Sequence, residues 1–145
     1  MELLKWLSIS DRYTKMHLDR ELAPLGLNSS QHMYILKICQ EPGITQDKFI
    51  NVFYIHPSNV TRSIAYLEKA DFIRKEPHPK DKRTCCLYPT EKGLAAYADI
   101  LNIQSNWHER LLADFSPEER ELFLAFLHKA GKKAILEVTK EIENQ

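Results

Sequence analysis

The feature that most constrains this fold is a pair of short helices joined by a tight turn. Pro57 suits the first turn of a helix, where its missing amide hydrogen costs nothing. Val60, Ile64 and Leu67 then recur at helical spacing, so one seam of that helix should be buried. A preceding short helix is expected over residues 46–53. Two such helices, the second with a small and polar outer face, indicate a helix-turn-helix.

The pattern then changes from helical to strand-like. Residues 72–76 and 84–88 are short and strand-like, and the intervening 77–83 are rich in proline, lysine and arginine. This order predicts a β-hairpin with a basic tip, or wing. Residues 56–92 carry eight basic and five acidic side chains, although the whole chain has 20 of each and no net charge. A local basic region favours a polyanionic partner, but an ordinary solvated surface explains the charge alone equally well.

The part of the chain before this pair of helices is also expected to be helical. A first helix over 2–22 should end at the Pro24-Leu25-Gly26 run. A second should begin at Asn28, whose side chain can form a capping box with that of Gln31. The buried stripe of this second helix is expected at Met33, Ile35 or Leu36, and Cys39, and Thr45 should cap the third helix.

The C-terminal half is also expected to be helical. One helix should run from Thr90 to about Leu112. Ser116 and Glu119 predict a second capping box, which opens a helix extending to about Ile142.

Length and composition place the chain among globular proteins. Its 145 residues, 43% hydrophobic and 28% charged, suffice for one domain with its own core. It has no run of 18 apolar residues and no signal-peptide pattern, so we expect no membrane span and a cytoplasmic location. Three cysteines, two of them adjacent, argue against a disulfide framework.

Taken together, these segments resemble the MarR family of winged helix-turn-helix transcriptional regulators over nearly the whole chain. The resemblance lies in the order and spacing of short stretches at 18–27, Gln31, 44–46, 60–62, 67–68, 73–74, 81–83 and 90–93. It implies a mainly α fold with a small β-hairpin wing, formed as a single domain over 1–145. Within it, 28–93 would be the winged helix-turn-helix, and 1–27 and 94–145 would be dimerisation helices. It also implies a homodimer that binds double-stranded DNA at a palindromic operator, usually as a repressor released by a small molecule.

Three positions depart from the family pattern. Asp71 replaces the usual glycine at the left-handed exit of the second helix of the pair. Pro89 replaces a leucine before Thr90, which removes one donor at a strand end. Phe49-Ile50 replaces a smaller pair. None of these positions belongs to the DNA-facing set.

The candidate DNA-binding residues lie on the outer face of the second helix and at the wing tip. A helix enters the major groove when its outer side chains are short and can hydrogen-bond to base edges. Arg62 could pair with guanine and Asn59 with adenine, or either could hold a phosphate. Arg83 is the candidate for the minor groove, and Asp81 could orient it, which resembles the family's Asp-x-Arg pattern. The plain alternatives are an ordinary exposed helix face and a surface ion pair worth ~0–1 kcal/mol.

The full candidate DNA-binding set comprises Thr45, Gln46, Pro57, Ser58, Asn59, Thr61, Arg62, Tyr66, Lys80, Asp81, Lys82 and Arg83. Thr45 and Gln46 are expected at a helix start, where free amides and the helix dipole favour a phosphate. The two lysines should add phosphate attraction and steepen the salt dependence of binding.

Effector binding and redox sensing are two further hypotheses. The resemblance implies a small-molecule site between the dimerisation helices and the winged helix. Candidate liners for an aromatic or anionic effector are Arg12, Tyr13, His17, Arg20, His32 and Tyr66, and the alternative is that these are ordinary core and surface residues. A thiol sensor must be partly exposed beside a cation, and Cys86, near the basic wing, fits this better than Cys85 or Cys39. The six histidines show no metal-ligand spacing, so no metal or other cofactor is expected.

The leading hypothesis is a DNA-binding repressor. The alternatives are a thiol- or oxidant-responsive regulator of the same fold and a winged helix that binds proteins without DNA. An enzyme is not expected, because the sequence shows no glycine-rich phosphate loop, nucleophile motif or metal-ligand spacing.

Overall fold

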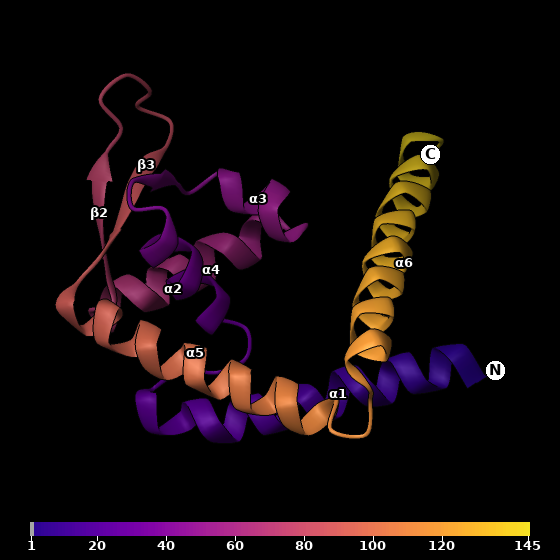
Figure 1. The fold of residues 1–145 in the computed structure, drawn as a ribbon. Helices are drawn as coiled ribbons and strands as arrows, with labels where there is room; N and C mark the ends of the chain where they lie inside the picture. The colour runs from indigo at the N-terminus through magenta and orange to yellow at the C-terminus, as the bar shows by residue number, and fades with distance from the viewer. Residues whose placement is uncertain (1) are drawn as a thin grey trace. The chain divides into compact units, whose positions relative to one another are not determined.

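The computed structural model describes residues 2–145 and is mainly helical, with one small sheet (Figure 1). In chain order the elements are α1 (Glu2–Leu22), the short 3-10 helix η1 (Ala23–Leu25), α2 (His32–Gln40), β1 (Ile44–Thr45), α3 (Lys48–Phe53), α4 (Pro57–Lys69), β2 (Ile73–Pro77), β3 (Cys85–Pro89), α5 (Glu91–Leu111) and α6 (Pro117–Glu143). They form two compact units, one ending at Ser105 and one running from Asn106 to Gln145. No helix within 2–145 is both long and apolar enough to span a bilayer.

The sheet has three antiparallel strands in the order β1-β3-β2, so β3 is the central strand. The predicted hairpin is confirmed, with Ile73 opposite Pro89 and Pro77 opposite Cys85. Its loop extends away from the helices as a free end (Figure 1). The hairpin is therefore a wing, as the sequence pattern predicted.

Strand β1 was not predicted, and it corrects the role expected of Thr45. Thr45 lies in this strand opposite Cys86, and α3 begins only at Lys48. The reason is backbone pairing: the amide of Gly43 donates to the carbonyl of Leu87 at 2.8 Å, and that of Gln46 to the carbonyl of Cys85 at 3.1 Å. These bonds hold Thr45 extended, so it does not cap α3. Gln46 lies in the turn just before α3, where its carbonyl accepts from the Phe49 amide at 3.3 Å.

Helix α2 begins later than the capping-box prediction placed it. The predicted return bond exists, since the amide of Asn28 donates to Oε1 of Gln31 at 3.2 Å. The Asn28 side chain, however, accepts from the amide of Ser30 at 2.9 Å and from its hydroxyl. Asn28 thus forms a local turn, a geometry that competes with helix capping, and the helix starts at His32.

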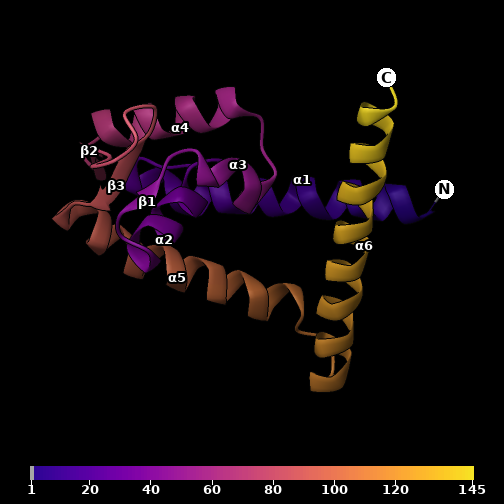
Figure 2. The ribbon, with the colours of Figure 1, turned by 90° about the horizontal axis from the view of Figure 1, so that it is seen from above.

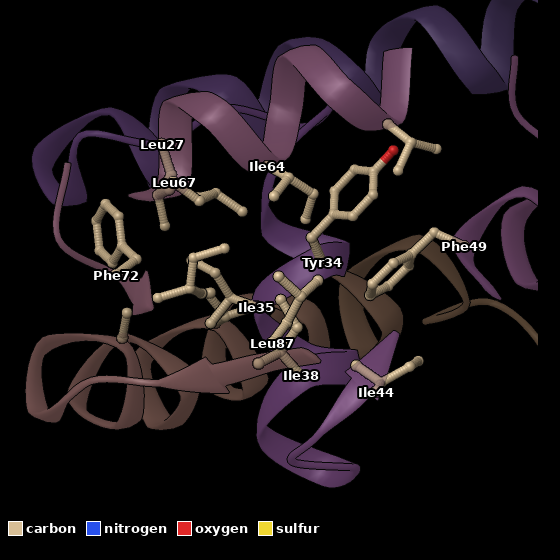
Figure 3. Packing of buried hydrophobic residues seen from close by; sticks show 14 of the residues in the cluster. Leu27, Tyr34, Ile35, Ile38, Ile44, Phe49, Ile64, Leu67, Phe72 and Leu87 are labelled. Atoms are coloured by element: carbon tan, nitrogen blue, oxygen red, sulfur yellow. The ribbon is translucent and has the colours of Figure 1, made fainter. Parts of the chain in front are cut away.

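The core lies between α2, α3, α4 and the sheet (Figure 3). The predicted seam of α4 is confirmed, because Val60, Ile64 and Leu67 are all buried. The expected α2 stripe is confirmed only at Ile35. The buried residues are His32, Tyr34, Ile35 and Ile38, while Met33, Leu36 and Cys39 are only partly covered. The Tyr34 ring packs against Phe49, with 4.9 Å between ring centroids, and against Phe53.

Two close-packed junctions fix the exit of α4. Asp71 adopts φ 66°, the left-handed conformation expected from the family pattern. Its carbonyl accepts from the hydroxyl of Thr90 at 2.6 Å, and the amide of Gly93 donates to the same hydroxyl oxygen. A Cβ at Gly93 would overlap the carbonyl oxygen of Phe72, so only glycine fits there. The wing is thereby joined closely to the start of α5.

The C-terminal unit is built from local contacts. The Ser116–Glu119 capping box is confirmed, with both reciprocal hydrogen bonds present at 3.0–3.1 Å. Arg120 donates to the carbonyl of Leu112 and pairs with Glu109 at 2.9 Å. Helix α6 is one continuous helix without a buried residue (Figure 2). Its large apolar side chains are exposed, namely Leu122, Phe123, Leu124, Phe126, Leu127, Leu136, Val138 and Ile142.

Candidate DNA-binding surface

Helix α4 presents a polar face opposite its buried seam. Ser58, Asn59, Thr61 and Arg62 are all exposed. Pro57 occupies the first turn, as predicted, and its carbonyl accepts from the Thr61 hydroxyl at 3.1 Å. The structure therefore groups the predicted base-reading residues on one solvent-facing surface.

The N-terminus of α4 is capped by a residue that the sequence pattern did not single out. The Nδ1 atom of His56 accepts from the amide of Ser58 at 3.1 Å and lies 2.7 Å from the Ser58 hydroxyl. Just before it, Tyr54 adopts a left-handed φ of 54°, which turns the chain between α3 and α4. Histidine is not among the residues that usually cap helices, so composition offered no signal for this role.

The wing tip carries the predicted Asp-x-Arg pair. Arg83 donates through Nε to Oδ1 of Asp81 at 3.1 Å and through Nη2 to Oδ2 at 3.3 Å. The Arg83 side chain is 91% exposed, and this guanidinium holds the pKa of the Asp81 carboxyl below its usual value. Lys80 and Lys82 are exposed beside the pair. An arginine held in the plane of a carboxylate while exposed to solvent is preorganised to enter a groove.

The backbone of this tip is held by His78. Its Nδ1 atom accepts from the amides of Lys80, at 3.1 Å, and Asp81, at 2.9 Å. Asp81 in turn accepts from the Arg83 amide at 3.0 Å. Sequence reasoning placed His78 in the loop but assigned it no role.

A hollow of about 420 Å³ connects the helix pair to the wing. Its walls include Gln46, Asp47, Thr61, Arg83 and Cys85. The Cys85 thiol donates to Gln46 at 3.3 Å, and the Thr84 hydroxyl donates to Asp47 at 3.1 Å. Hydroxyl groups of Thr45 and Thr84 hold the pKa of Asp47 below its usual value. The hollow brings Gln46, Pro57, Thr61, Lys82 and Arg83 of the predicted set around one depression.

Tyr66 is tethered at the far end of α4. Its hydroxyl donates to the carbonyl of Gly26 at 2.5 Å, which links α4 to the turn after η1. Tyr66 also lines a second hollow of about 570 Å³ together with Lys15, Ser29 and Arg62.

The other predicted effector residues do not line this second hollow. Arg12, Tyr13 and Arg20 are exposed on α1, where the Arg12 guanidinium lies 5.9 Å from the centre of the Tyr13 ring, and His17 is half-buried. His32 is buried, and burial holds its pKa below the usual value. Its Nδ1 atom has no hydrogen-bond partner among the described residues. The structure thus does not gather the six candidates into one cavity.

The expectation for Cys86 is corrected. Cys86 is only 8% exposed because it lies on the central strand β3, between Thr45 of β1 and Glu76 of β2. Cys85, expected to be the covered thiol, is the more accessible of the two. Burial raises the pKa of the Cys39 and Cys85 thiols, which lowers their reactivity. Across residues 2–145 no cluster of three or more histidine, cysteine or acidic side chains is arranged to hold a metal ion.

A helix-turn-helix followed by a wing with an exposed, carboxylate-held arginine defines a winged-helix, DNA-binding regulator. Comparison with known proteins agrees. The sequence profile of the MarR family matches residues 27–85. The uncharacterized HTH-type transcriptional regulator YybA of Bacillus subtilis is 33% identical over 112 residues, which cover 77% of this chain and 75% of the relative.

Solved structures of MarR-type proteins are also similar to this chain. A MarR protein from Peptoclostridium difficile matches with a TM-score of 0.91 and 26% identity, covering 97% of this chain and 92% of that one. A putative MarR family regulator from Listeria monocytogenes, complexed with 26mer DNA, matches with a TM-score of 0.84 and 27% identity, covering 90% and 87%. The chain belongs to the MarR family, and it is a DNA-binding transcriptional regulator and not an enzyme.

Proposed function

We propose that this protein is a homodimeric repressor that binds a palindromic operator and is released by a small-molecule ligand. The observation that carries the DNA-binding part is the pairing of two exposed elements, the polar face of α4 and the Asp81–Arg83 tip. The likeness to a Listeria regulator crystallised with DNA supports it. Action at an operator would place the protein in the cytoplasm.

In this proposal the two elements read different parts of the duplex. Asn59 and Arg62 reach base edges in the major groove, while Ser58 and Thr61 allow close approach. Arg83 enters the adjacent minor groove, and Lys80 and Lys82 neutralise phosphates. Gln46, in the hollow between helix and wing, would contact the backbone with its side chain and not through a helix dipole.

The dimer is inferred from apolar surface. The eight large apolar side chains on α6 are exposed in the single chain, as are Leu3, Leu4 and Trp6 on α1. Surfaces of this kind are uncommon on monomers and mark interfaces. A two-fold dimer would place two copies of α4 in major grooves about 34 Å apart, which accounts for a palindromic site.

Ligand release requires a compound that binds better to the form unable to bind DNA. The second hollow supports this part of the proposal, because Arg62 and Tyr66 of α4 form part of its wall with Lys15 of α1. A ligand there would contact the DNA-reading helix directly. Lys15 and Arg62 would favour an anionic compound.

The test is selection of duplexes from random-sequence DNA by the purified protein, followed by affinity measurements at several salt concentrations. We expect a palindromic consensus and a steep negative slope of log affinity against log salt. Arg62→Ala should lower the preference for the selected duplex by about 1–3 kcal/mol, and Arg83→Ala should also weaken binding. Lys37→Ala removes a charge from α2, where Lys37 pairs with Glu41, and is the matched control. Equal affinity for all duplexes in every variant would contradict the proposal and favour a protein-binding winged helix.

A further inference from the structure

Two histidines hold the backbone of the two DNA-facing elements through the same ring atom. Nδ1 of His56 accepts from the amide of Ser58 at the start of α4. Nδ1 of His78 accepts from the amides of Lys80 and Asp81 at the wing tip. A ring nitrogen accepts a hydrogen bond only when it carries no proton, so both contacts require neutral imidazole.

We infer that His56 and His78 are positioning residues for DNA recognition, and that protonating them releases the operator. This inference rests on the proposed function above. Neither residue needs to touch DNA, because each acts through a neighbour that does.

At the wing the effect passes along a short chain of contacts. His78 fixes the amide of Asp81, and the Asp81 carboxylate accepts from the amide and the guanidinium of Arg83. A protonated His78 would lose both amide bonds and turn a donor toward them. The Asp81 carboxylate, which already faces Arg83, would then also face a second cation beside it. The direction in which Arg83 points would therefore no longer be fixed.

At α4 the effect is direct. His56 is the helix cap, and its ring contacts Ser58, a predicted DNA-contacting residue. A proton on Nδ1 would remove the cap and place a positive charge at the positive end of the helix dipole. The first charged side chain along α4 is Arg62, which is also a cation. Loss of the cap would loosen the turn that carries Ser58 and Asn59.

The charges around His78 come from the wing and from the segment before α3. Asp81 interacts electrostatically with it, Lys80 and Lys82 follow it in the loop, and Asp47 in turn interacts with Asp81. Imidazole is the side-chain group whose charge a moderate change of pH alters, so a pH comparison is the appropriate test.

Protonation should weaken recognition of the operator, whereas the added positive charge alone would strengthen binding to DNA. Added positive charge on a DNA-binding surface strengthens non-sequence-specific attraction to phosphates. The loss of positioning instead weakens recognition of the operator alone. The informative quantity is therefore the ratio of affinities for the selected duplex and for a scrambled duplex of the same length.

The experiment measures this ratio at pH 8.0 and 5.5, at constant ionic strength and well below the unfolding temperature. In the wild type it should fall about tenfold at pH 5.5, which corresponds to the loss of one or two ordinary hydrogen bonds. His56→Asn and His78→Asn supply an amide oxygen that can accept the same backbone bonds at every pH. Each should retain the ratio at pH 8.0 and reduce the fall, and the double variant should abolish it.

His56→Ala and His78→Ala lack an acceptor and should show a low ratio at both pH values. Amide resonances of Ser58, Lys80 and Asp81 should shift with pH in the wild type and stay constant in the asparagine variants, with or without DNA. A flat ratio in the wild type, a full fall in the double asparagine variant, or unresponsive amides would overturn the inference. Absence of selective binding at pH 8.0 would instead overturn the proposed function, and with it this role for the histidines.

Discussion

The winged helix and the C-terminal unit stabilise themselves in different ways. Between α2 and β3 the chain buries a continuous core that includes Tyr34, Phe49, Ile64 and Leu87. In α6 no residue is buried, although eight large apolar side chains lie along it. The DNA-reading part therefore carries its own hydrophobic core, whereas α6 depends on an additional surface to cover its apolar residues.

The largest expected effect belongs to the core. Phe49 is fully buried against Tyr34 and Phe53, so Phe49→Ala should lower the free energy of unfolding by about 3–5 kcal/mol. Urea denaturation followed by circular dichroism measures this. Val52→Ala removes apolar atoms from the same helix at a site that is 40% exposed, and it should change stability by at most about 0.5 kcal/mol. Equal losses in both variants would show that burial of Phe49 in the core is not what stabilises the winged helix.

The next effect tests α6. Phe126 is 62% exposed in the single chain, so Phe126→Glu should weaken self-association by about 2–3 kcal/mol, roughly 30- to 150-fold in the dissociation constant. Analytical ultracentrifugation over a concentration series measures the change. Glu141→Gln alters charge on the same helix and serves as the control. A wild-type protein that stays monomeric at micromolar concentrations would show that α6 is not an interface between copies.

A third prediction concerns acid sensitivity of the winged helix. Burial holds the pKa of His32 below its usual value, so the unfolded chain binds a proton more readily than the folded chain. The contribution of neutral, buried His32 to the free energy of unfolding should therefore be complete above pH 6.5 and should decrease as the pH falls below 6.5. Thermal unfolding at pH 7.5 and 5.5 measures how much the midpoint temperature falls with pH, and His32→Gln should reduce this fall. His128→Gln, on the exposed surface of α6, should leave it unchanged.

The smallest effect is expected at the start of α6. Ser116→Ala removes the cap and should cost about 1 kcal/mol, and Ser116→Thr should restore most of it. The Ser116 amide holds the pKa of Glu119 below its usual value, so this half of the box is lost as the pH falls through the lowered pKa of that carboxyl. Chemical denaturation of the full chain is the measurement. A loss as large as that of Phe49→Ala would mean that α6 carries a core of its own.

Elements with local signals could be predicted from the sequence. The apolar spacing of Val60, Ile64 and Leu67, the proline at position 57 and the Ser116 capping box placed α4 and α6 within a residue or two. The Asp81–Arg83 contact was also expected, although on a strand: the pair lies in a turn, where the Asp81 carboxylate accepts from both the amide and the guanidinium of Arg83. In each case the determining contacts lie within a few positions of one another.

What could not be predicted depends on contacts between distant segments or on an unusual use of a side chain. Thr45 resembles a helix cap until Cys86, 41 positions later, pairs with it in the sheet. Cys86 itself is covered because β3 has a strand on each side. His56 and His78 act as acceptors for backbone amides, a role that composition does not signal. The Tyr66 hydroxyl reaches Gly26 only in the folded chain.

The short strand β1 has a consequence for altering specificity. Because β1 pairs with β3 up to Cys86, and β2 pairs with β3 up to Pro77 and Cys85, the base of the wing moves with the helices. Only the loop from 78 to 84 lies beyond the ladder. Apart from Thr84, which donates to Asp47, the length and composition of this loop can thus be redesigned independently of the scaffold that holds α4, so preferences for flanking DNA can be tuned while recognition of the central bases is kept.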